Sequence, residues 1–154
     1  MNMKSLARAR DKAELVTRLG KLTPQSDRCW GRMTAPQMVC HLADACRMAL
    51  GQKRVSDDSS ALRRTIIKWL ALYAPLPWRA GIVTSPEIDQ QIAGTCPADF
   101  TADVAEVRAL LDAIEKRGLR GTWPDHPVFG RMSAPDWLRW AYLHTDHHLR
   151  QFGL

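Results

Sequence analysis

The spacing of hydrophobic residues along the chain predicts helices. In five segments apolar residues recur at intervals of three and four, which is the pattern of helices that bury one face. No segment alternates apolar and polar residues over several positions, as a half-buried strand would. The predicted helices cover residues 6–20, 34–51, 59–73, 98–117 and 133 to nearly the C-terminus, and most of them end at Gly or Pro.

Two of these helices begin with similar local sequences. Gly31-Arg-Met-Thr-Ala-Pro-Gln37 precedes the second helix, and Gly130-Arg-Met-Ser-Ala-Pro-Asp136 precedes the last. In both, a hydroxyl side chain is followed by Pro and then, three positions after the hydroxyl, by a residue that can hydrogen-bond back to it. This arrangement is typical of a capping box. It predicts where the two helices start, and it therefore sets which faces their later residues occupy.

A long irregular segment separates the third and fourth helices. Residues 74–97 are rich in Pro, Gly, Ser and Thr, and a connection of this length is expected to carry part of a site or to cover the core. The 154 residues fit one compact domain. We therefore predict a single domain, residues 1–154, with an all-α fold: an up-down four-helix bundle with an additional short helix and a long loop before the fourth helix.

Composition and charge exclude several functional classes. The net charge is +6, which suggests an acidic partner, but the basic residues are scattered and no nucleic-acid-binding motif occurs, so we expect no nucleic-acid partner. Lys68, Pro75 and Arg79 interrupt the apolar stretch 66–83, and the N-terminus lacks a secretory core. We expect a cytoplasmic protein with no membrane partner. Its four cysteines lack Cys-x-x-Cys spacing and are expected to be reduced and mostly structural.

Three of the five histidines are predicted to share one helix face. His41 lies 7 residues after the Thr34 cap, and His144 and His148 lie 11 and 15 residues after Ser133, so all three fall within about 60° of the cap direction at ~100° per residue. A buried imidazole needs a partner, and histidines at i and i+4 can reach one metal ion. Three histidine ligands would leave coordination positions open, as in catalytic sites.

Other interpretations of these residues stay open at this point. The histidines could instead form a hydrogen-bonded core, and His147 could replace His148, although it is turned roughly 80° away from the inward face. His126, which precedes Pro127 in a loop, is expected to stabilise a turn but could reach the site. Asp44 follows His41 by three residues and could orient it, serve as a fourth ligand or face solvent.

Several motifs resemble the DinB/YfiT-like superfamily of bacterial four-helix-bundle proteins. They are Met38-Val-Cys-His-Leu-Ala-Asp44 and the ending Tyr142-Leu-His-Thr-Asp-His-His-Leu-Arg-Gln-Phe-Gly153. The chain is most similar to a branch of unknown function, which it resembles in residues 86–99, in His126-Pro-Val-Phe-Gly130 and in the ending from Asp146. The resemblance implies a divalent metal ion, with zinc as first choice and nickel or iron as alternatives, held by His41, His144 and His148.

The resemblance also implies a reaction class. Characterised relatives include thiol-dependent S-transferases and a maleylpyruvate isomerase that uses a low-molecular-weight thiol, so we expect a metal-dependent transferase or hydrolase with a small-molecule substrate, and a homodimer. The transferase ending His-Arg-Gly-Gln is His148-Leu-Arg-Gln151 here, which weakens the assignment to thiol transfer. The alternative is a non-catalytic, stress-associated binding protein with core histidines, whose Trp137 and Trp140 would make a dimer contact.

Overall fold

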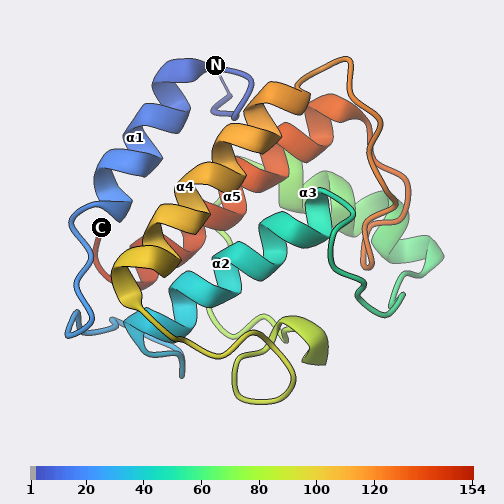
Figure 1. Ribbon diagram of the computed structural model, residues 1–154. Coiled ribbons are helices and arrows are strands. Elements are labelled where there is room, and N and C mark those ends of the chain that lie inside the picture. Colours follow the sequence, from blue (N-terminus) through green and yellow to red (C-terminus); the bar gives the residue numbers. More distant parts are fainter. Residues whose placement is uncertain (1–2) are drawn as a thin grey trace.

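The computed structural model describes residues 3–154 and is helical in its regular parts (Figure 1). Within that range there is no strand, only an isolated bridge between His126 and Gly130. The prediction of an all-α fold is confirmed. In chain order the elements are α1 (Ala9–Leu19), α2 (Ala35–Ala49), the π-helical turn η1 (Arg63–Ile67), α3 (Lys68–Tyr73), the 3-10 turn η2 (Pro86–Ile88), α4 (Phe100–Arg117) and α5 (Ala134–Gln151).

The two predicted capping boxes are present. At α2 the Thr34 hydroxyl accepts a hydrogen bond from the backbone N–H of Gln37, whose side chain accepts one from the Thr34 N–H. Ser133 and Asp136 make the same pair of hydrogen bonds at the start of α5. These bonds satisfy backbone donors that a helix N-terminus leaves free. Both helices that carry the clustered histidines therefore begin where their sequences indicate.

Four helices pack as a closed ring, in which α2 lies against α4, α4 against α1, α1 against α5 and α5 against α2 (Figure 1). Side-chain contacts show the relative directions of neighbouring helices. Arg47 pairs with Glu106, and the Leu50 carbonyl accepts from Arg117, so α2 and α4 are parallel. The contacts Glu14–Tyr142 and Arg18–Asp146 show that α1 and α5 are also parallel.

This order of directions differs from the up-down alternation that we expected. The chain leaves one end of α2, passes through η1, α3 and the long connection, and returns to the starting end before α4 begins (Figure 1). Because the third predicted helix and the long connection together span the length of the ring, α4 runs in the same direction as α2. The four helices thus run up, down, down and up.

The core lies inside the ring and contains buried residues of α1, α2, α4 and α5. Twelve of the fifteen residues of α2 are buried, which matches a helix with neighbours on several sides. Trp137 and Trp140 are 0% and 4% exposed. They belong to the core, so the dimer contact that the alternative interpretation assigned to them is wrong.

Cys40 and Cys46 are also buried free thiols, and burial raises the pKa of each to about 12.

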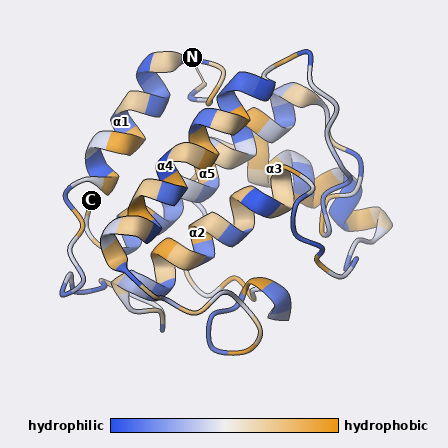
Figure 2. Ribbon diagram, in the orientation of Figure 1, coloured by the Kyte–Doolittle hydropathy of each residue, from blue (hydrophilic) through white to orange (hydrophobic). Residues whose placement is uncertain are grey.

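The third predicted helix packs less completely than its apolar pattern suggests. It is formed by η1 and α3 together, and Leu72 is its buried residue. Ile66 and Trp69 of the apolar stripe are 57% and 59% exposed. Figure 2 shows hydrophobic positions on this segment, outside the ring of four helices. No helix in residues 3–154 is long and apolar enough to cross a membrane.

Candidate metal centre

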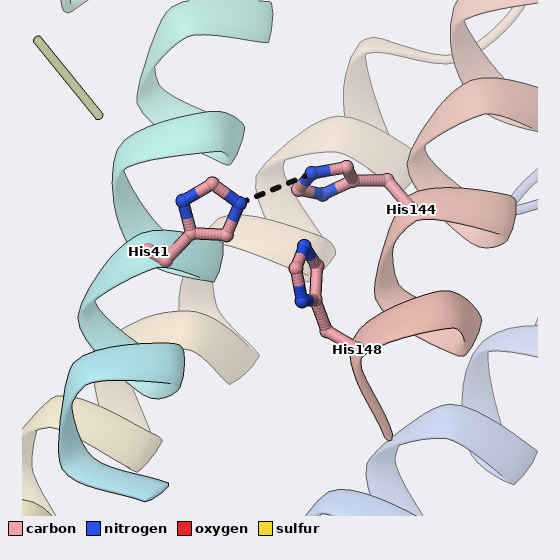
Figure 3. A group of neighbouring side chains, drawn as sticks. All are labelled: His41, His144 and His148. Atoms are coloured by element: carbon pink, nitrogen blue, oxygen red, sulfur yellow. Dashed lines mark hydrogen bonds between the residues drawn. The ribbon is translucent and has the colours of Figure 1, made fainter. Parts of the chain in front are cut away.

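Three imidazoles meet between α2 and α5 (Figure 3). His41 comes from α2, and His144 and His148 lie one turn apart on α5. One nitrogen of each ring lies within 4.8 Å of the other two. The Nε2 atoms of His41 and His144 are 3.3 Å apart. The structure therefore brings together the three histidines that the helix phases predicted to face a common point.

A backbone carbonyl determines the proton position on His41. The Nδ1 atom of His41 lies 2.7 Å from the carbonyl oxygen of Ile88, in η2. A carbonyl oxygen can only accept, so Nδ1 must carry the proton and Nε2 must present a lone pair. This lone pair faces the other two histidines (Figure 3). The long connection thus contributes to the site, as its length suggested.

Asp44 holds this part of the connection in place. Its buried carboxylate accepts hydrogen bonds from the backbone N–H and hydroxyl of Thr95, at 2.8 and 2.7 Å, and from the Gln90 amide at 3.0 Å. It also pairs with Arg47 and Lys53. Burial alone would raise its pKa, but the bonds from Lys53 and Thr95 hold the pKa below its usual value. The carboxylate is neither solvent-facing nor part of the three-histidine group, and it orients His41 indirectly.

A side-chain amide determines the proton position on His148. Nδ1 of His148 lies 3.0 Å from Oε1 of Gln151, and Nε2 of Gln151 donates to the carbonyl of Trp30 at 2.9 Å. Because the Trp30 carbonyl can bind only the NH₂ end of the amide, the oxygen end faces His148. Nδ1–H of His148 is therefore the donor, and its Nε2 presents a second lone pair to the cluster.

Aromatic packing orients His144. Its ring stacks on the indole of Trp140, with 4.8 Å between centroids and 16° between planes. Trp78 contacts it from the long connection, at 6.1 Å between centroids. Unlike His41 and His148, which are buried, His144 keeps part of its surface accessible. The group is therefore closest to solvent at His144.

All three rings are expected to be neutral at pH 7. Burial lowers the pKa of each below the ordinary value. The neighbouring imidazoles lower the pKa of His144 and His148 further, whereas the Ile88 carbonyl and nearby carboxylates partly oppose the shift of His41. Neutral imidazole is the form that binds metal ions.

The donor set fits a divalent metal ion. Two nitrogens bound to one tetrahedral ion at roughly 2.0–2.1 Å lie about 3.3 Å apart, which equals the separation of the His41 and His144 Nε2 atoms. The two lone pairs assigned by the Ile88 and Gln151 contacts point to the same place. The three histidines could thus hold a metal ion, and imidazole ligands suit zinc, nickel, copper and iron.

The remaining two histidines lie outside this group. Nδ1 of His126 accepts from the backbone N–H groups of Val128 and Phe129, as expected for a residue that stabilises a turn. Its ring is separated from His144 by Trp140, which contacts both. His147 packs 5.0 Å from His148 between centroids, and its buried Nδ1 has no hydrogen-bond partner in residues 3–154.

Sequence reasoning assigned no role to three residues that support the cluster. Gln151 lies three residues after His148, so helix spacing could have identified it. Trp140 was considered for a dimer contact, whereas its ring in fact stacks on His144. The Ile88 carbonyl could not be found, because it reaches His41 from an irregular segment 47 residues away in the chain.

The chain matches a known protein family. A family model described as a protein of unknown function, DUF1569, matches residues 2–153. Neither a curated protein nor a solved structure shows significant similarity to the chain. The match covers both helices of the histidine group and the connection that supports them.

Proposed function

The chain belongs to the DUF1569 family of proteins of unknown function, and we propose that it is a metal-dependent enzyme in which His41, His144 and His148 hold one divalent ion. The observation that carries this proposal is the direction of the Nδ1 hydrogen bonds. His41 and His148 both use their Nδ1–H outward, on Ile88 and Gln151. Both therefore turn Nε2 lone pairs inward.

A hydrogen-bonded histidine core would suit this arrangement poorly. With Nδ1 protonated on two of the rings, only His144 can donate a proton into the cluster, and its Nε2 can serve one acceptor at a time. A cation satisfies all three nitrogens together. Three protein ligands also leave positions for a substrate, as in catalytic zinc sites.

The family resemblance supports the finer assignment. We propose that the ring of α1, α2, α4 and α5 is a bundle of DinB/YfiT type, because the motifs that resemble this superfamily contain all three clustered histidines. A bound divalent ion would act as a Lewis acid that makes a thiol or a water more acidic. The proposed reaction is transfer of a thiol to a small electrophile or hydrolysis of a small molecule, with zinc as the first candidate metal.

Residues of the chain would orient the ligands for this role. Ile88 and Gln151 keep protons on the outer nitrogens, and Trp140 restrains the ring of His144. Such outer contacts fix the tautomer and raise the basicity of a metal-bound imidazole. The buried thiols of Cys40 and Cys46 are unsuited to act as the nucleophile, because burial raises their pKa to about 12.

Elemental analysis of purified protein tests the proposal. We expect about one divalent metal ion per chain, and its loss in His144→Ala. His126→Asn is a matched control, because it changes a buried histidine outside the group and should keep the metal. Full metal content in His144→Ala, or no binding of zinc, nickel or iron by the unaltered protein, would reject the site and leave a non-catalytic helical protein.

A further inference from the structure

A cavity of about 290 Å³ lies between the start of the long connection and the outer face of α5. Its walls are mainly apolar, with three charged side chains among them. The residues that matter for its chemistry are Leu76, Trp78, Leu143, Arg139, Asp146 and Arg150. The volume is close to the lower end of the range for small-molecule sites.

Trp78 is shared by this cavity and the histidine group. Its indole lines the cavity, and its ring centroid is 6.1 Å from that of His144 and 5.9 Å from that of His147. The indole N–H donates a hydrogen bond to the Ala71 carbonyl at 2.7 Å, which fixes the ring in this position. One aromatic side chain thus lines the cavity and contacts His144, the least buried of the three clustered histidines.

The charges at the cavity do not cancel. Asp146 pairs with Arg150 at 2.9 Å and with Arg18 at 2.7 Å, so its carboxylate is neutralised. Arg139 forms no ion pair within residues 3–154, and its Nε and Nη1 donate to the carbonyls of Leu72 and Lys4. The guanidinium keeps N–H groups for another acceptor. The cavity therefore combines apolar walls with an unpaired positive charge.

We propose that this cavity binds a small molecule with an apolar body and a carboxylate, and that the carboxylate pairs with Arg139. Carboxylates match the donor geometry of a guanidinium, and Leu76, Leu143 and Trp78 offer apolar surface to the rest of the ligand. The further statement that this is the substrate pocket of the histidine site rests on the function proposed above. The substrate class is then a small apolar carboxylic acid.

Fluorine NMR with 4-(trifluoromethyl)phenylacetate, using the metal-free protein, tests the cavity itself. The acid should bind at least about tenfold more tightly than its neutral amide, because only the carboxylate can form a charge-assisted pair with the Arg139 guanidinium. Arg139→Gln should remove this preference, whereas Arg79→Gln, which removes a nearby exposed arginine, should keep it. Equal binding of acid and amide would overturn the proposal.

Leu143→Trp tests the location without changing the charge. The larger side chain should fill the cavity and abolish binding of the acid, so the proposal stays testable even if Arg139→Gln fails to fold. Unchanged binding in this variant would place the acid elsewhere and reject the cavity.

The Co²⁺ form distinguishes this inference from the proposed function. If the cavity is the substrate pocket, the acid should change the visible absorption of bound Co²⁺ in the unaltered protein but not in Leu143→Trp. Failure to bind Co²⁺ rejects the metal site while the NMR result still decides the cavity. Binding of the acid with an unchanged Co²⁺ spectrum rejects the link between the two.

Discussion

His148 and Gln151 are joined by a hydrogen bond of 3.0 Å near the C-terminal end of α5, and the same amide is anchored to the Trp30 carbonyl at 2.9 Å. One side chain thus connects the segment before α2 with a histidine of the cluster. Because both ends of the amide are engaged, it cannot rotate without losing a bond. Gln151 therefore keeps the Nε2 lone pair of His148 directed at the other two histidines, although Gln151 itself forms no hydrogen bond with either of them.

Replacement of Gln151 by Met should weaken metal binding without removing a ligand. Met is close to Gln in length, but its sulfur is only a weak acceptor for Nδ1–H of His148, so the imidazole loses most of its tautomer preference. We expect a roughly 10- to 100-fold lower affinity, measured by competition with a chelator of known affinity. Gln52→Met, at an exposed position, should leave the affinity unchanged. Equal affinities of the two variants would contradict the orienting role.

Asp44→Asn should destabilise the fold and loosen the support of His41. The neutral amide keeps the shape but weakens the contacts with Lys53 and Thr95, and it cannot accept at both oxygen positions. Disturbing a buried hydrogen-bonded charge costs about 1–3 kcal/mol of unfolding free energy, which urea denaturation would measure. Asp27→Asn, at an exposed position, is the control and should change the stability little. A fully stable Asp44→Asn protein would show that the contacts with residues 90–95 are dispensable.

The helix starts could be predicted because their signals are local. A capping box involves residues three positions apart, so Thr34 and Ser133 are recognisable without knowledge of the fold. The directions of the helices could not be predicted from such local signals. Whether α4 runs parallel or antiparallel to α2 depends on the path of residues 50–99, where long-range contacts such as Thr95 with Asp44 decide the course.

The same distinction applies to the site. His144 and His148 share a face because they are one turn apart on a helix whose start is known, and His41 follows from the same reasoning on α2. The short distances between the three rings depend on α2 and α5 packing against each other. The spacing of hydrophobic residues does not predict which helices pack together. The role of Asp44 stayed open for the same reason, since its partners come from the loop after η2.

His126 should make the fold sensitive to acid. Burial lowers its pKa to about 3, whereas the unfolded chain has the ordinary value near 6.5. Between these values the unfolded state binds a proton that the folded state does not, so the unfolding free energy falls as the pH decreases, by about 1.4 kcal/mol per pH unit.

His126→Asn isolates this contribution. The Asn oxygen can replace Nδ1 as acceptor for Val128 and Phe129, but it does not titrate. Urea denaturation of the metal-free proteins between about pH 6.5 and 4.5 should give a shallower pH dependence for the variant. The other histidines are present in both proteins, so their effect cancels in the comparison. Identical slopes would mean that His126 is protonated in the folded state.

Trp140 should report metal binding directly, because its indole stacks on His144 at 4.8 Å between centroids. Titration of metal-free protein with paramagnetic Co²⁺ should quench tryptophan fluorescence and saturate at about one equivalent. Trp140→Phe keeps an aromatic ring against His144 and should still bind Co²⁺, but with a smaller fractional quench. Trp69→Phe removes an indole that is 59% exposed on α3 and should retain the quench. If the two variants respond alike, or if quenching continues well beyond one equivalent, Co²⁺ does not bind beside His144.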